Sequence, residues 1–430
     1  MVNRVLSSAL LMAMAGSAVW GEETSILNRQ LPSWVRFNIE ERVREESVIG
    51  MGFRPSNDDT YVLQRFRPGL TLLPATWLKF RFQGQDARVF YKDQKPHAPP
   101  FQDRWDLRQA YVEVGYAEKG ALMRVGRQEI NLGDERLVGS TNWTNAARSF
   151  DAVRAAYKWG KYRVDAFASS VVVLKDGDLG ERTAGNNLHG LVGGTDNVIP
   201  RSTLEAYALW RLSPRVKAEL GPAGTLDFFT YGLRWVGKLP AALDYGVEVA
   251  MQRGSLGPDK VSAWAGHWVV GYAVPGFKLK PRLLGEYNYA TGDGDTRDGR
   301  RHTFDQLYPT AHDKYGLADQ VGWKNIHHLR TGVELKPSAK LAVAGKLSAY
   351  WLADSHDGLY NAASAVIARK ADGSGGRFVG EEVDGAALYS FSKSVVAGGG
   401  VGHIFPGQFL KAASPGHSLT YQYLFLETKF

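Results

Sequence analysis

The sequence predicts an all-β fold: a single transmembrane, antiparallel, up-and-down β-barrel of about 18 strands. Three observations predict this fold. The chain begins with an export signal, its strands alternate apolar and polar side chains, and the connections between strands are short and long in turn.

The export signal occupies the first residues of the chain. Arg4 supplies a positive charge, the segment from Val5 to Ala15 is apolar, and small residues continue to Gly21. An apolar segment of this length is too short for a membrane-spanning helix and is typical of a secretory signal. We therefore expect residues 1–21 to be a signal peptide and residues 22–430 to be one outer-membrane β-barrel domain.

The composition favours a large exported β-protein. The chain has no cysteine but 48 glycines, 12 Trp, 19 Tyr and 19 Phe, and no flexible linker divides it. No apolar run of about 18 residues follows the signal, so no transmembrane helix is expected, whereas a transmembrane strand needs only about 9–11 residues. The net charge of +8 suits a nucleic acid or an anionic solute. Export, and the lack of a nucleic-acid-binding motif, favour the anionic solute.

The first mature strand shows the alternation of side chains. Its apolar and polar residues take turns: Val35, Phe37, Ile39 and Val43 against Arg36, Asn38, Glu40, Arg42 and Arg44. Successive side chains of a strand point to opposite faces, so the first set faces lipid and the second set faces the lumen. Residues 78–85 repeat this alternation, whereas Glu41 breaks it.

The connections decide between a barrel and a soluble sandwich. Short turns are expected at Leu73–Thr76, Ala117–Gly120, Gly160–Lys161, Gly237–Ala242, Val274–Phe277, Pro337–Lys340 and Ser392–Ser394. Longer segments fall between them, at about 45–60, 88–104, 131–150, 291–326, 353–378 and 405–418. Short turns at one end and long loops at the other are typical of porins in the cell outer membrane.

Chain direction requires one further strand. Strands near 161–173 and 203–213 would run the same way unless another strand lies between them, and residues 187–195 are the candidate. The last strand ends in Phe430, with Leu424 and Leu426 on one face. A terminal aromatic residue of this kind resembles the signal that the barrel assembly machinery reads, so that machinery is an expected partner.

Cations dominate the expected lumen face. Strand parity places Arg65, Arg67 and Arg81 there, among other arginines and lysines that outnumber the acidic residues. Arginine holds carboxylates bidentately, and charge in a narrow pore selects counter-ions, so the lumen suits an anionic solute such as a chain of carboxylated sugars. The alternative is a lumen of mixed salt bridges that only satisfy one another.

The stretch from Gly126 to Arg154 is unusually charged for a barrel loop. We expect it to fold inward or to cap the mouth, and the alternative is a solvated external loop. Arg127 has the parity of the lipid-facing Met123 and Val125. It must therefore lie beyond the bilayer edge, or the register must shift at Gly126.

A metal site is also conceivable in the segment TGDGDTRDG, residues 291–299. Asp293, Asp295 and Asp298 stand among glycines there, and oxygen ligands on a tight loop suit a structural Ca²⁺. The alternative is an ordinary Gly/Asp turn. No other cofactor is expected.

Several motifs together resemble the alginate export family of outer-membrane barrels. They are TYGLR (230–234), TGDGDTRDG (291–299), TFDQLYPT (303–310), YGLADQVGW (315–323), WLADSHDGLY (351–360), HIFPGQFL (403–410) and the run GRQ…DER…FDAVR. The resemblance implies an 18-stranded barrel that carries acidic polysaccharide outward through an arginine-rich constriction. It transfers a lumen role to the matching residues Arg108, Arg124, Arg127, Arg136 and Arg154. A long, late periplasmic turn helps to gate the family's alginate exporter, but the late turns here are short.

We therefore expect a channel with an electropositive lumen for an anionic solute, with export of alginate or a similar acidic polysaccharide as the leading reading. A general or uptake porin for small anionic or sugar solutes is the alternative. An enzyme is not expected, because no Ser/His pair with an orienting partner stands out. The expected partners are outer-membrane lipid, the barrel assembly machinery and the anionic solute, with no nucleic acid.

Overall fold

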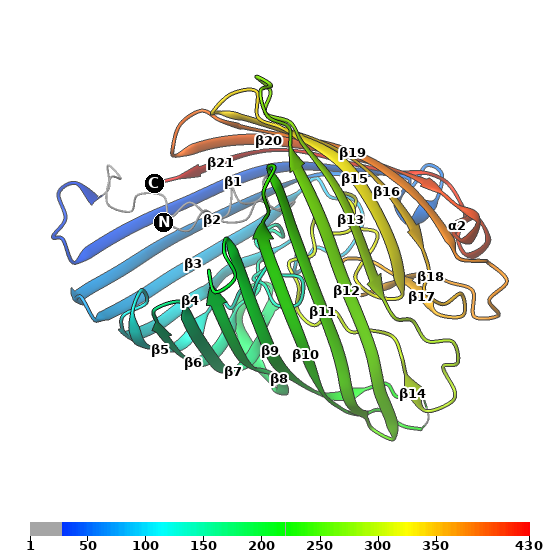
Figure 1. Cartoon of the computed structure of the whole chain (residues 1–430), viewed down its shortest axis with the longest axis horizontal. Helices are drawn as coiled ribbons and strands as arrows, with labels where there is room; N and C mark the ends of the chain where they lie inside the picture. The colour runs from blue at the N-terminus through cyan, green and yellow to red at the C-terminus, as the bar shows by residue number, and fades with distance from the viewer. Residues whose placement is uncertain (1–27, 220) are drawn as a thin grey trace.

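The structure is a computed structural model that describes residues 28–219 and 221–430. The expected signal peptide, residues 1–21, lies outside these described residues. Long strands, all antiparallel to their neighbours, close into a barrel of 18 strands, which confirms the predicted fold class (Figure 1). Within the described residues, no helix is long and apolar enough to cross a membrane.

The wall strands follow one another around the barrel in chain order. Their bounds are β1 Val35–Ile49, β2 Asp59–Ala75, β3 Leu78–Phe90, β4 Asp103–Gly115, β5 Gly120–Gln128, β6 Phe150–Trp159, β7 Tyr162–Lys175, β8 Asp178–Asp196, β9 Ser202–Val216, β10 Gly224–Lys238, β11 Leu243–Leu256, β12 Asp259–Ala273, β13 Arg282–Ala290, β15 Ile326–Leu335, β16 Leu341–Trp351, β19 Phe378–Ser390, β20 Val395–Pro406 and β21 Leu419–Lys429. The strand expected at 187–195 is the second half of β8.

Short elements lie in the loops. They are the 3-10 turn η2 Met51–Phe53, the two-residue strand β14 Arg300–Arg301, the hairpin of β17 Gly358–Tyr360 with β18 Val366–Arg369, and the helix α2 Gln408–Ala413. The strand β14 pairs in parallel with β12 and takes no place of its own in the wall.

The first and last strands close the barrel. β1 pairs with β2 on one side and with β21 on the other, where Val43 lies opposite Leu426 and Glu40 opposite Lys429. Closure removes the unpaired strand edges that lipid could not satisfy, because hydrocarbon offers no hydrogen-bond partners. The expected short turns and long loops alternate around the two ends, although the first long loop, 50–58, and the turn 274–281 differ in length from expectation.

The two faces of the wall follow the predicted parity. Phe37 is 43% exposed and Val43 is 44% exposed on the outer face, whereas Arg42 and Arg44 are buried inside. Glu41, which breaks the alternation, has a partner on the outer face. Its Oε1 accepts a hydrogen bond of 2.8 Å from Nε2 of Gln64. The neighbouring strand therefore satisfies this polar outer-face residue.

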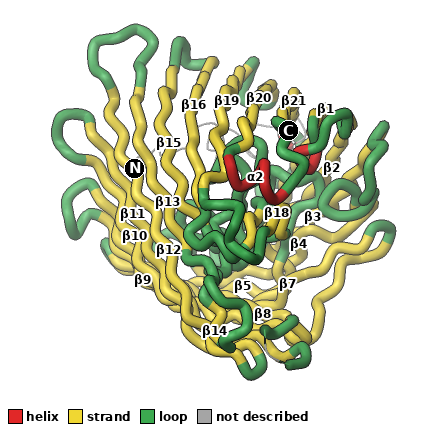
Figure 2. Tube along the Cα trace, turned by 90° about the vertical axis from the view of Figure 1, so that its right-hand side faces the viewer, coloured by secondary structure: helices red, strands yellow, loops and turns green. Residues whose placement is uncertain are grey.

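Two long loops fold into the barrel and meet there. The backbone of the 129–149 loop bonds that of the 291–325 loop, with Gly139 N donating to Tyr308 O at 2.9 Å and Tyr308 N donating to Leu137 O at 2.8 Å. Figure 2 shows loops gathered inside the ring of strands. Both loops are largely buried, so packed chain occupies part of the lumen.

The 352–377 loop covers the 291–325 loop from the long-loop end. Asp357 joins the two, because its carboxylate accepts hydrogen bonds from Asp293 N at 3.1 Å, Thr303 Oγ1 at 2.5 Å and Tyr360 OH at 2.7 Å. The helix α2 contacts β18 and β19 and buries Phe409 and Leu410. The 291–325 loop, the 352–377 loop and the segment that contains α2 are therefore packed together.

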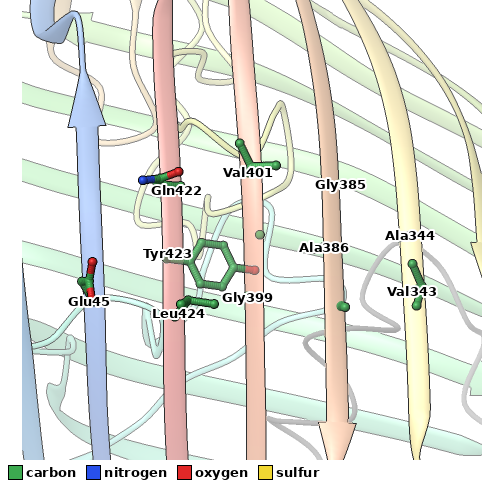
Figure 3. A pocket seen from close by; sticks show the side chains of 12 residues that line it. Glu45, Val343, Ala344, Gly385, Ala386, Gly399, Val401, Gln422, Tyr423 and Leu424 are labelled. Carbon is green, nitrogen blue, oxygen red and sulfur yellow. The ribbon is translucent and has the colours of Figure 1, made fainter.

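Glycines let the 291–325 loop approach the wall. A Cβ added to Gly400 would lie 2.8 Å from the Tyr423 ring and 3.0 Å from Leu317 Cδ2, so only glycine fits between them. The same stretch of small residues leaves a hollow of about 520 Å³ across β16, β19, β20 and β21 (Figure 3). Glu45 and the outward-facing Leu424 border this hollow.

The β7–β8 hairpin completes the wall where two strands are short. β5 ends at Gln128 and β6 begins at Phe150, because the 129–149 chain turns into the lumen between them. Beyond these strand ends β8 contacts β4 directly, with Gly180 N donating to Asp106 Oδ1 at 2.8 Å.

Candidate functional site

The lumen arginines fall into two groups. One group pairs with carboxylates across neighbouring strands toward the short-turn end. Arg124 Nε lies 2.7 Å from Glu113 Oε2, Arg154 Nε lies 2.9 Å from Asp165 Oδ2, and Arg282 Nη1 lies 3.0 Å from Glu334 Oε2. These arginines match the reading in which lumen charges satisfy one another.

The second group, which we name the arginine cluster, consists of Arg42, Arg44, Arg65, Arg67 and Arg108. Alternation along β1 and β2 places four of them on the inner face, and Arg42 lies directly opposite Arg65. Arg108 has the opposite parity to the inward-facing Tyr111 and Glu113. A bulge in β4, where Gly84 pairs with Leu107 and Gln83 with Gln109, turns it inward.

Main-chain oxygens of the 129–149 loop fill the arginine cluster. Arg42 Nη2 and Arg44 Nη1 donate to Trp143 O at 2.9 and 2.6 Å, and Arg65 Nη1 donates to Asn142 O at 2.7 Å. The side-chain Oδ1 of Asn142 accepts from Arg67 at 3.1 Å and from Arg108 at 2.8 Å. Each of the five arginines therefore donates at least one hydrogen bond to a neutral oxygen of this loop.

Carboxylates balance only part of this charge. Glu40 lies 2.5 Å from Arg65 and 3.2 Å from Arg67, Glu427 lies 3.6 Å from Arg65, Glu46 lies 2.6 Å from Arg44, and Glu129 contacts Arg108, so four carboxylates of the described chain face five arginines. Among the described residues, Arg42 forms no ion pair within 4.0 Å. The buried Nε atoms of Arg42, Arg44, Arg65 and Arg108 lack hydrogen-bond partners. Unpaired charge at low dielectric attracts anions strongly.

Trp143 links the two inner loops at the cluster. The Arg44 guanidinium lies 3.9 Å from the centre of a Trp143 ring, and the His312 ring stacks on Trp143 at 3.8 Å with an interplanar angle of 2°. His312 Nδ1 is 2.7 Å from Asp319 Oδ2. A cation–π contact and a ring stack thus hold the loop tip in place.

The 291–325 loop has its own anchors on the wall. Lys346 Nζ lies 2.5 Å from Asp313 Oδ2, and Arg330 Nη1 donates to Asp313 O at 3.1 Å. Arg136 donates to Glu286 Oε1 at 3.2 Å and lies beside His267 and Tyr315. Arg136 therefore fastens a loop to the wall.

The eight arginines expected in the lumen separate in the structure. Arg65, Arg67 and Arg108 belong to the cluster. Arg81 lies outside it and donates a hydrogen bond of 2.6 Å to Asn38 Oδ1. Arg124 and Arg154 belong to the paired group. Arg127 lies at the end of β5, where it pairs with Asp151 at 2.8 Å and donates to Gly180 O. Pairing runs unbroken through Gly126, so no register shift occurs there.

The sequence analysis did not identify the loop residues whose neutral oxygens bind the arginines. Parity already placed Arg42 and Arg44 on the lumen face, but nothing in the sequence indicates that Asn142, Trp143 and Thr144 bind them. These segments lie about 100 residues apart, as the separations of 99 to 102 positions show.

The aspartates of 291–299 mostly bind backbone in the structure. Asp293 accepts hydrogen bonds from Asp295 N at 3.1 Å and His302 N at 3.0 Å, and Asp298 accepts one from Arg300 N at 2.8 Å. The part of the chain that the structure describes has no group of three or more acidic, His or Cys side chains placed to share a metal ion. Calcium binding by Asp293, Asp295 and Asp298 stays a prediction.

Two cavities flank the 129–149 loop. One of about 890 Å³ opens among the long loops and is bordered by Trp143, Tyr61, Phe101 and Lys92. The other, of about 190 Å³, lies on the opposite side of the loop beside Arg154, Arg163 and Arg234. Residues of the loop therefore line two cavities, a larger one with a mainly apolar lining and a smaller one beside arginines.

These features define the class of protein. A closed 18-stranded barrel with an apolar outer wall, exposed rim aromatics such as Trp34, Trp77 and Trp159, and a charged interior is an outer-membrane channel. The sequence matches the Alginate export family over residues 33–423, and the chain belongs to that family.

Solved structures with the same fold include proteins of Pseudomonas aeruginosa. OpdK has a TM-score of 0.62 at 8% identity, and the match covers 92% of this chain and 98% of that one. OccK8 (OprE) has a TM-score of 0.61 at 10% identity, with the same two coverages. At such low identity the likeness concerns the fold alone. No curated protein matches the sequence.

Proposed function

We propose that this channel passes anionic solutes, and that its solute is a carboxylated polysaccharide, alginate or a similar polyuronate, carried outward. One observation carries the proposal: five buried arginines converge on a loop that offers them mainly neutral oxygens. The paired arginines elsewhere in the lumen do not support the proposal, because neighbouring carboxylates already balance their charge.

The chemistry of the arginine cluster supports a carboxylate ligand. A guanidinium binds carboxylate through two parallel hydrogen bonds and stays charged at all working pH values. A polyuronate presents a carboxylate on every sugar, so it can exchange one arginine for the next. Family membership supports the export of such a polymer.

Passage of small anions inward is the second candidate. Two cavities, of about 890 and 190 Å³, favour it, because each is closer in size to a small molecule than to a polymer. One structural neighbour, with a TM-score of 0.61 at 9% identity, is Pseudomonas aeruginosa OpdK with vanillate, a small carboxylate.

Planar-bilayer recording tests the proposal. We expect the reversal potential in a salt gradient to show anion preference, and oligouronates to block the current increasingly with length while neutral dextran does not. Cation preference would contradict the proposal. Block that is independent of length would support the small-anion channel instead.

A matched pair of variants locates the selectivity. Arg42→Gln should lower the anion-to-cation permeability ratio several-fold, because it removes from the cluster a charge that has no ion-pair partner within 4.0 Å among the described residues. The double variant Arg124→Gln/Glu113→Gln removes a balanced pair and should leave the ratio unchanged. Equal effects of the two variants would show that selectivity does not arise at the cluster.

Assembly is a separate expectation. Recognition of the last strand, ending in Phe430, by the barrel assembly machinery stays a prediction, as does structural calcium.

A further inference from the structure

We propose that the tip of the 129–149 loop, residues 141–144, is an internal ligand of the arginine cluster, and that solute carboxylates bind the cluster by displacing this tip. The inference rests on the proposed function and names how the site is regulated: the solute opens its own path.

The contacts show how the tip imitates a ligand. The carbonyl oxygens of Asn142, Trp143 and Thr144 all accept hydrogen bonds from Arg42, at 3.1, 2.9 and 3.1 Å. Arg65 takes two of the same oxygens, those of Asn142 at 2.7 Å and Thr144 at 3.1 Å. Consecutive oxygens that converge on guanidinium groups occupy the positions that carboxylate oxygens would take.

Charge favours the exchange. A carboxylate adds opposite charge and two parallel hydrogen bonds to a guanidinium, whereas a main-chain carbonyl is neutral and supplies one acceptor atom. The unpartnered Nε atoms of Arg42 and Arg65 offer further donors to a bidentate ligand. A carboxylate therefore gains bonds that the main-chain carbonyls cannot make, and it also neutralises the excess charge.

The tip can move while its base stays in place. Residues 141–144 are only partly buried or exposed, whereas Val138, Asn145 and Ala147 are buried. Asn145 Nδ2 is anchored to three wall or loop carbonyls, those of Gln64, Arg88 and Phe101, at 2.9 to 3.0 Å. Displacement is therefore confined to a few residues between fixed points.

Trp143 sets the threshold for release. Its ring lies between Arg44 and His312, so leaving the cluster breaks the cation–π contact and the stack together. One carboxylate replaces one set of carbonyls, but several carboxylates on one chain replace all of them. A uronate oligomer should therefore open the tip at concentrations where the monomer does not.

Thiol labelling of the whole barrel tests the inference, and the natural chain has no cysteine to interfere. Thr144→Cys places the reporter on the tip. Ala147→Cys, at a position 1% exposed on the anchored base, is the matched control. We expect oligogalacturonate to raise the maleimide labelling rate of T144C at least several-fold, maltooligosaccharide of equal length to leave it unchanged, and A147C to stay protected.

A further variant tests whether Trp143 holds the tip in place. Adding Trp143→Ala to T144C should give rapid labelling without any ligand, because the cation–π contact and the ring stack that hold the tip are both lost. Slow labelling of this double variant would show that Trp143 does not hold the tip in place.

The outcomes separate the two proposals. Unchanged labelling of T144C in a channel that oligogalacturonate still blocks would overturn the displaceable tip and leave the proposed function standing. Equal acceleration of T144C and A147C would also overturn it, because the whole loop would then be leaving. Cation preference in the bilayer would sink the proposed function itself.

Discussion

At the scale of single residues, neighbours decide what a charge does. Arg124 and Arg42 both point into the lumen from β-strands, but Arg124 bonds the carboxylate of Glu113 opposite it, whereas Arg42, with Glu427 opposite it on β21, donates its hydrogen bonds to loop carbonyls. The same side chain is a structural cross-link in one place and a candidate binding group in the other.

Glu219 provides a residue-scale prediction of pH dependence. Burial and the neighbouring Asp293 raise the pKa of Glu219 from 4.5 to about 8. Because the folded pKa is raised, this group's contribution to stability is full below pH 4.5 and is lost as the pH rises through about 8. We therefore expect the packing around Asp293 to loosen between pH 6 and pH 9, about the raised pKa.

Hydrogen exchange of peptides covering residues 291–299, corrected for the intrinsic rate, measures this loosening. Glu219→Gln keeps the shape of the side chain without its charge, so its exchange protection should be nearly independent of pH. Identical profiles for the wild type and the variant would show that Glu219 does not titrate against Asp293.

At the scale of elements, the β7–β8 hairpin covers the gap that the inward-folded 129–149 loop leaves in the wall. The 129–149 chain leaves the wall to form the inner loop, and the hairpin leans across the resulting gap to reach β4. Asp176 at its tip accepts hydrogen bonds from Arg104 Nε at 2.9 Å and from Gln102 Nε2 at 2.8 Å.

Asp176→Ala should release the hairpin tip without unfolding the barrel. We expect trypsin to cleave after Lys175 or Arg182 several-fold faster in this variant, because the segment loses its contacts with β4. Mass spectrometry of timed digests provides the measurement, and Asp176→Asn, which keeps one acceptor oxygen, should fall between. An unchanged cleavage rate would mean that the bonds of Asp106 and Arg127 to Gly180 are enough to hold the hairpin.

At the scale of the whole molecule, closure between β1 and β21 makes the barrel one cooperative unit. Leu424 lies opposite Gly399 of β20 and Glu45 of β1, so its backbone belongs to a strand with partners on both sides. Its side chain is 67% exposed on the outer wall. Backbone pairing therefore matters more than packing at this position.

Leu424→Pro should abolish the folded barrel, because proline removes a ladder hydrogen bond from an interior strand. Leu424→Ala shortens the side chain and keeps the backbone donor, so it should fold. Heat-modifiable migration in gel electrophoresis distinguishes a closed barrel from an open chain. A heat-modifiable L424P band would show that the seam tolerates a missing bond.

The sequence by itself determined the fold class, the strand count and the face on which the regularly alternating wall residues lie. Those properties depend on local alternation and on turn length, so they can be read from neighbouring residues such as Phe37, Arg42 and Val43. Even the strand around 187–195 followed from chain direction alone, and β8 confirms it.

Only the tertiary structure decided which arginines are paired and which are not. Arg42 meets Trp143, and Trp143 meets His312, across separations of 101 and 169 positions that no local pattern encodes. The bulge that turns Arg108 inward and the partner that satisfies Glu41 belong to neighbouring strands. The physical reason is that charge balance in a closed barrel depends on which segments the wall and the inward-folded loops bring together.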